Sequence, residues 1–134
     1  MVGGGRPYAD ASALAKLVLR EPESDPLRAY LVARPDPATS RLAFVEVQRA
    51  IGGVIDAPDV EALAAVWDRT AFIELSPAVA ESAARIGPSA LRSLDAIHVA
   101  SALAMGDELE AFVTYDLRLA DASRAAGLTV VAPA

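Results

Sequence analysis

The 134-residue chain contains no cysteine and a single histidine, His98. No disulfide can form, no thiolate can bind a metal, and a zinc site built from several imidazoles is excluded. If His98 is packed inside a helix, no imidazole remains for a Ser–His–Asp triad. The lack of cysteine is compatible with a reducing compartment, and we expect the protein to be cytoplasmic.

Long apolar runs and positive charge are also scarce. No apolar run reaches the ~18 residues of a membrane span, so we expect a soluble protein with no membrane partner. Residues 1–7 hold three glycines and one arginine but no apolar signal-peptide core. The net charge of −6 argues against binding a nucleic-acid backbone by bulk electrostatics, but it leaves room for an enzyme that uses bound cations. Carboxylates are the remaining metal ligands, and they favour Mg²⁺ or Mn²⁺.

Short apolar runs alternate along the chain with longer amphipathic stretches, and most of their apolar residues are aliphatic. Hydrophobic residues make up 54% of the sequence and aromatics only 5%, which favours closely packed helices rich in Ala and Leu. Strands are predicted at 7–9, 72–75, 111–114 and 128–131, and helices at 12–19, 27–33, 42–51, 60–68, 77–86, 91–103 and 117–126. This order predicts an α/β fold with a mainly parallel sheet between helical layers. Residues 1–6 are expected to be a flexible lead, and 7–134 one domain.

Four acids stand alone in apolar surroundings on separate predicted elements: Asp10, Glu46, Asp95 and Asp116. A carboxylate in such a setting is costly unless it is paired or binds a cation. Asp10 and Asp116 close two predicted strands, where ligands bind in open α/β sheets. Acids that converged there would repel one another unless a cation neutralised them, so the set points to a metal more than any member does.

Two of these acids have an ordinary explanation as helix caps. Asp10 could cap the helix that follows it, although Ser12 could cap that helix equally well. Asp116 stands at a strand–helix junction and could also be only a cap.

The other two acids have candidate partners on their own helices. Glu46 is three residues before Arg49, and a surface ion pair would account for it. Asp95 could pair with Arg92 or accept a hydrogen bond from His98, each three residues away. We interpret His98 as a packed residue that could orient Asp95, rather than as a ligand or general base.

Four motifs together carry a family resemblance. In order, they are DASAL at 10–14, VEV at 45–47, SLDAIHVA at 93–100 and TYDLRL at 114–119. In sequence order and spacing this set resembles the PIN domain, and within it the VapC-type toxin ribonucleases of toxin–antitoxin pairs. The resemblance runs from about Tyr8 to Val131. It implies a PIN-like three-layer α/β/α sandwich with a small, mainly parallel central sheet.

The resemblance also implies an activity and the residues that perform it. The activity would be Mg²⁺-dependent endoribonuclease cleavage of RNA, with Mn²⁺ as an alternative ion. By carry-over, Asp10 and Asp95 would be the main metal ligands, and Glu46 and Asp116 would complete a catalytic cluster of four carboxylates. Ser12 and Thr114 match supporting positions, and Arg118 is a candidate for binding the substrate phosphate. A cognate antitoxin protein and a homodimer are the implied partners.

The sequence departs from the family pattern in two places, and two other functions compete. Gly3-Gly4-Gly5-Arg6-Pro7 replaces an apolar first strand, and the segment before Thr39 shows no clear apolar strand.

A phosphoacceptor receiver domain would need a second acid beside Asp10 and a lysine closing a late strand, and both are missing. A PIN fold kept as a catalytically inactive protein-binding module is the remaining alternative.

Overall fold

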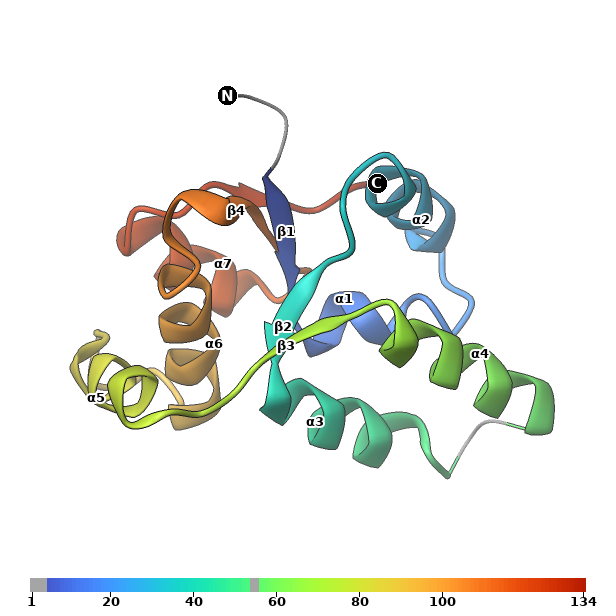
Figure 1. Ribbon diagram of the computed structural model, residues 1–134, viewed down its shortest axis with the longest axis horizontal. Helices are drawn as coiled ribbons and strands as arrows, with labels where there is room; N and C mark the ends of the chain where they lie inside the picture. The colour runs from blue at the N-terminus through green and yellow to red at the C-terminus, as the bar shows by residue number, and fades with distance from the viewer. Residues whose placement is uncertain (1–4, 54–55) are drawn as a thin grey trace.

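The computed structural model describes residues 5–53 and 56–134 (Figure 1). Five strands in that part form one sheet in the order β3-β2-β1-β4-β5, and every neighbouring pair is parallel. The strands are β1 (Arg6–Ala9), β2 (Ala38–Ser40), β3 (Ala71–Ile73), β4 (Leu109–Val113) and β5 (Val130–Val131). The helices are α1 (Ala11–Ala15), α2 (Ser24–Val32), α3 (Arg41–Ile51), α4 (Ala57–Asp68), α5 (Pro77–Arg85), α6 (Ser93–Leu103) and α7 (Leu117–Ala125), with the 3-10 turn η1 (Gly106–Glu108).

The two faces of the sheet carry separate hydrophobic cores, because successive strand residues point to opposite sides. Ala9 and Val113 pack with α1, α2, α3 and α4 on one face. Their neighbours Tyr8 and Phe112 pack with α6 and α7 on the other. Figure 1 shows the sheet between these two groups of helices. The predicted three-layer α/β/α fold with a parallel sheet is therefore confirmed.

The strand order reverses at β1. From β1 the chain builds β2 and then β3 on one side, and it crosses back to place β4 and β5 on the other. In open parallel sheets the crevice for ligands lies at such a reversal, beyond the carboxyl ends of the strands. The residues that follow β1 and β4 therefore lie at the natural binding edge of this fold.

The N-terminal strands differ from the sequence expectation. Residues 1–4 of the expected lead lie outside the described residues, but Arg6 already belongs to β1 and pairs with Leu109 of β4. The strand that the sequence failed to indicate before Thr39 exists as β2, which is paired with β1 and β3. Its three residues are all buried, although two are polar. An apolar pattern could not reveal a strand this short, because its position comes from backbone pairing on both sides.

The first two helices also have different limits from those predicted. The helix expected over 12–19 ends at Ala15. Beyond that point, the Ser24 hydroxyl donates hydrogen bonds to the backbone carbonyls of Lys16 and Leu19 at 2.7 and 3.1 Å. The next helix begins at Ser24 rather than at residue 27, and Glu23 is its N-cap. Pro26 fits inside that first turn, where backbone N–H groups have no helical partner to lose.

No helix among the described residues is long and apolar enough to cross a membrane.

Candidate functional site

Asp10 follows β1 directly and is buried, with 3% of its surface exposed. Its Oδ1 accepts hydrogen bonds from the Ser12 hydroxyl at 2.7 Å and from the Ala13 N–H at 3.0 Å. Its Oδ2 accepts from the Thr114 hydroxyl at 2.6 Å. Asp10, not Ser12, is the N-cap of α1. Burial raises the pKa of Asp10, although the hydrogen bonds from Thr114 and Ser12 oppose that rise.

The two hydroxyls that contact Asp10 are themselves held by the backbone after β4. The Ser12 oxygen accepts the Tyr115 N–H at 3.0 Å, and the Thr114 oxygen accepts the Asp116 N–H at 3.1 Å. Each hydroxyl therefore donates its proton to Asp10 and accepts a backbone N–H of the neighbouring loop. These hydrogen bonds of Ser12 and Thr114 join the ends of β1 and β4, and their supporting role in a metal site stays a prediction.

Asp95 lies in the first turn of α6 and is partly exposed. Burial raises its pKa, and the negative charge of Asp116 raises it further. Glu46 adds a smaller increase, while the charges of His98 and Arg92 oppose it. No hydrogen bond or ion pair of Asp95 with either of its two expected partners occurs among the described residues. The carboxylates of Asp116, before α7, and of Glu46, on α3, therefore both lie close enough to Asp95 for their negative charge to act on it.

Glu46 does not make the ion pair expected with Arg49. It points instead to His98, and its Oε1 lies 2.7 Å from Nε2 of the imidazole. The expectation that His98 orients Asp95 is therefore wrong, because both ring nitrogens have other partners. Spacing along one helix could not reveal this contact, which joins α3 and α6 across 52 positions.

Asp116 is the N-cap of α7, and its Oδ1 accepts the N–H groups of Arg118 and Leu119 at 2.9 and 3.2 Å. The ordinary cap explanation is therefore correct for this residue. It does not remove Asp116 from the site, because one carboxylate oxygen accepts both cap bonds and its charge still acts on Asp95. Arg118 is exposed in the first turn of α7. Its predicted contact with the substrate stays a prediction.

Sequence reasoning missed Tyr8. Its ring is fully buried, and its hydroxyl contacts Nδ1 of His98 at 2.6 Å and the Ser40 N–H at 3.0 Å. A tyrosine in a strand with a buried ring usually finds a partner for its hydroxyl, and this was the available signal. The partner itself could not be predicted, because it lies on α6.

The donor set suits a hard cation held by few direct ligands. Within the described residues, no three His, Cys, Asp or Glu side chains lie close enough together to hold one ion by themselves. Mg²⁺ commonly takes only one or two carboxylates and completes its shell with water and substrate phosphate oxygens. Burial and the negative charges of Asp116 and Glu46 raise the pKa of Asp95, and a positive ion near Asp95 would offset those charges.

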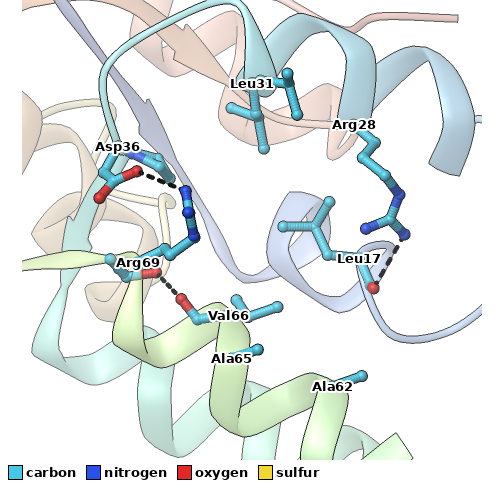
Figure 2. Close-up of a pocket in the computed structure, with 11 residues that line it drawn as sticks. Leu17, Arg28, Leu31, Asp36, Ala62, Ala65, Val66 and Arg69 are labelled. Carbon is cyan, nitrogen blue, oxygen red and sulfur yellow. Dashed lines mark hydrogen bonds and ion pairs between the residues drawn. The ribbon is translucent and has the colours of Figure 1, made fainter.

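A second concave feature lies away from these acids. A groove of about 300 Å³ runs between α2 and α4. Figure 2 shows Ala62, Ala65 and Val66 along its floor, while Arg28 reaches the Leu17 carbonyl at 3.2 Å. Arg69 lies 3.8 Å from Asp36 at the other rim. The groove is apolar with charged rims and contains none of the four candidate acids.

Known proteins match this chain over most of its length. The PIN domain family matches residues 8–125. Ribonuclease VapC47 from Mycobacterium tuberculosis (strain CDC 1551 / Oshkosh) is 41% identical over 130 residues, which cover 94% of this chain and 96% of that protein.

Two solved structures share the fold. VapBC2 from Rickettsia felis, bound to a DNA fragment from their promoter, has a TM-score of 0.74 at 14% identity and covers 96% of this chain and 98% of the other. The sarcin–ricin loop cleaving toxin VapC20 from Mycobacterium tuberculosis has a TM-score of 0.72 at 17% identity, with coverage of 95% and 99%. The matched family spans most of the chain, so this protein belongs to the PIN-domain family, and its relatives there are VapC-type ribonucleases.

Proposed function

We propose that the chain is a metal-dependent endoribonuclease, the toxin of a toxin–antitoxin pair. Its site would consist of Asp10, Glu46, Asp95 and Asp116. The observation that carries this proposal is geometric: Asp10 is buried at the end of β1, and hydrogen bonds from Ser12 and Thr114 hold both of its oxygens beside the loop that carries Asp116. Burial raises the pKa of Asp95 on α6, and the charges of Asp116 and Glu46 raise it further, which is in keeping with this proposal. Carboxylates gathered in this way on a ribonuclease relative suit a cation that in turn binds an RNA phosphate.

Each residue has a distinct part in this account. Asp10 and Asp95 would be the main ligands of Mg²⁺ or Mn²⁺, and Glu46 and Asp116 would complete the acidic cluster. The ion, when bound, would supply positive charge that offsets the charge of the phosphate group. Ser12 and Thr114 fix the direction of both Asp10 oxygens, so this ligand needs no rearrangement.

The reaction would be hydrolysis of a phosphodiester bond. A water oxygen would bond to phosphorus and lose a proton, while the bond from phosphorus to one ribose oxygen would break and that oxygen would gain a proton and leave as a hydroxyl group. The chain has a net charge of −6, so without a cation it would repel the RNA backbone. Arg118, which is exposed beside Asp116, is the candidate for a phosphate contact on the protein side.

The antitoxin would bind the groove between α2 and α4. The side chains along the groove recur at helical spacing on both helices, with Arg28 and Leu31 on α2 and Ala62, Ala65 and Val66 on α4. An apolar helix from a partner, with acids beside its apolar face, would match the apolar floor and the arginines at the rims. The homodimer and the cytoplasmic location stay predictions.

The test is cleavage of a mixed RNA panel by purified, antitoxin-free protein with Mg²⁺, with Mn²⁺ and with EDTA. We expect cleavage with either ion, none with EDTA, and none by Asp10→Asn or Asp95→Asn. Asp107→Asn is the matched control, because it makes the same change at an exposed position in η1. Cleavage that persists in EDTA would contradict the metal mechanism. No cleavage under any condition would favour the inactive protein-binding module.

A further inference from the structure

A row of hydrogen bonds lies behind the acids, and the proposed function does not use it. Tyr8 of β1 is fully buried and His98 of α6 is 2% exposed. The Tyr8 hydroxyl lies 2.6 Å from Nδ1 of His98, and Nε2 of the same ring lies 2.7 Å from Oε1 of Glu46 on α3. The row therefore joins β1, α6 and α3 and ends on a candidate metal ligand.

The direction of these hydrogen bonds follows from the partners of Tyr8. The Ser40 N–H can only donate, and it lies 3.0 Å from the Tyr8 oxygen, so that oxygen is an acceptor there. The phenolic proton must go elsewhere, and burial keeps it on the oxygen by raising the pKa of Tyr8 well above its ordinary value. Thr39 and Ser101 have buried hydroxyls nearby, but neither oxygen meets hydrogen-bond geometry within the described residues. Among the described residues, the atom within hydrogen-bond distance that is left to accept this proton is Nδ1 of His98, 2.6 Å away.

An imidazole whose Nδ1 accepts a hydrogen bond carries its proton on Nε2. We propose that Tyr8 and His98 are positioning residues for Glu46: Tyr8 donates to Nδ1 of His98, and Nε2–H of His98 donates to Oε1 of Glu46, which fixes where that carboxylate points. The proposal rests on the proposed function only in taking Glu46 as part of the cation site.

Glu46 needs such a partner. Its side chain is 26% exposed. Without a partner, rotation about the bonds of that side chain would let the carboxylate turn toward water. The same Tyr8 oxygen also holds the Ser40 N–H, and Ser40 is the N-cap of α3. One phenol thus contacts both the start of α3 and, through His98, the carboxylate on its second turn.

The first test reads the imidazole directly in metal-free protein. His98 is the only histidine, so a ¹⁵N NMR spectrum contains one imidazole. At mildly alkaline pH we expect protonated Nε2 and an unprotonated Nδ1 that accepts a hydrogen bond. Tyr8→Phe should shift the Nδ1 resonance and introduce the other tautomer. A wild-type ring that carries its proton on Nδ1, or on both nitrogens, would overturn the proposal.

The second test compares two amide substitutions of His98 by their affinity for Mn²⁺ alone. The amide nitrogen of His98→Gln can reach the place of Nε2 and donate to Glu46, whereas the shorter side chain of His98→Asn reaches only the place of Nδ1. We expect His98→Gln to bind Mn²⁺ close to the wild-type affinity and His98→Asn to bind about tenfold more weakly. Equal losses in two variants that are folded by circular dichroism would contradict the proposal. Should both unfold, the Tyr8→Phe spectrum decides it.

A double-mutant cycle separates positioning from general packing. If His98 acts through Glu46, His98→Asn causes no further loss of Mn²⁺ affinity once Glu46→Ala is present. The same loss in both backgrounds would show that His98 acts on the fold as a whole. A wild type that binds Mn²⁺ but cuts no RNA would contradict the proposed function and leave this inference standing. If the wild type binds no Mn²⁺, the proposed function fails, and the tautomer alone decides the hydrogen-bond row.

Discussion

The residue with the most constrained environment is Asp10. It is buried, it caps α1, and both of its oxygens accept hydrogen bonds, yet its pKa remains raised because burial outweighs those bonds. A structural role would not require a charge here, since an amide could accept the same cap bond. Proteins depart from local stability rules mainly at functional sites, and Asp10 fits that pattern.

Asp10→Asn should therefore leave the metal-free protein as stable as the wild type or more so, by about 1 kcal/mol. The amide oxygen can keep the bonds from Ser12 and Ala13, and its NH₂ group can donate to Thr114. Urea unfolding in EDTA measures the change. A loss of several kcal/mol would mean that the charge itself stabilises the fold.

The stability difference between these two proteins should depend on pH. Burial raises the pKa of Asp10 in the folded state, so between the ordinary and the raised pKa the folded protein binds more protons than the unfolded chain. The contribution of Asp10 to stability then falls as pH rises through that range. The advantage of Asp10→Asn should be small at low pH and grow as pH rises. A constant difference across a pH series of urea titrations would be inconsistent with a raised pKa.

The limits of sequence reasoning are clearest at His98. The four acids could be chosen from the sequence because each breaks an apolar pattern within its own segment. The partners of His98 could not be predicted from the sequence, because helical spacing predicts contacts only between residues three or four positions apart. Glu46 and Tyr8 reach His98 from other elements of the fold.

Among the elements, α7 illustrates how one side chain can serve the fold and the site together. Asp116 begins the helix with a single oxygen, Oδ1, that accepts two backbone N–H groups. Its charge still reaches Asp95 on α6. The cap and the charge are separable by substitution, because asparagine caps helices about as well as aspartate.

Asp116→Asn should keep the stability of the wild type while reducing RNA cleavage, because it retains the cap and removes the charge. Asp116→Ala should lose the cap as well, with a cost of about 1 kcal/mol. Thermal unfolding and cleavage rates of the two variants distinguish these effects. If Asp116→Asn cleaves RNA at the wild-type rate, Asp116 is only a cap.

Element boundaries were predictable where a local signal decides them. The predicted starts of the helices at 42 and 77 agree with α3 and α5 to within one residue, and Ser40 and Ser76 cap these helices with bonds made within three residues. The end of α1 was not predictable, because the Ser24 hydroxyl of the next helix donates to the carbonyls of Lys16 and Leu19, which follow α1. The polar strand β2 was missed for a similar reason: its neighbours β1 and β3 position it.

At the scale of the whole molecule, the parallel sheet keeps the groove apart from the four candidate acids. The strand reversal at β1 sets Asp10 beside the loop after β4 that carries Asp116, and Glu46 on α3 contacts His98 of α6, the helix that carries Asp95. The apolar groove lies elsewhere, between α2 and α4, and the small side chains of Ala62 and Ala65 line it on α4. The sequence predicted the layers that produce this arrangement, but it could not predict the groove, which two helices form jointly.

If the groove takes the antitoxin, Ala65→Glu should weaken antitoxin binding by about 1–3 kcal/mol, because it places a charge in an apolar contact. Ala64→Glu is the matched control, since Ala64 is an exposed neighbour on α4 that does not line the groove. Titration calorimetry with the co-purified antitoxin measures both. Equal affinities for the two variants would place the antitoxin on another surface.

The most direct test of the central claim, that these carboxylates form one cation site, is calorimetric titration of Mn²⁺ into the metal-free protein. We expect the wild type and Asp107→Asn to bind with the same affinity and Asp95→Asn to bind at least about tenfold more weakly, because a direct ligand is lost. Wild-type affinity in a folded Asp95→Asn variant would contradict the account, because Asp95 is proposed as one of the two main ligands of the ion.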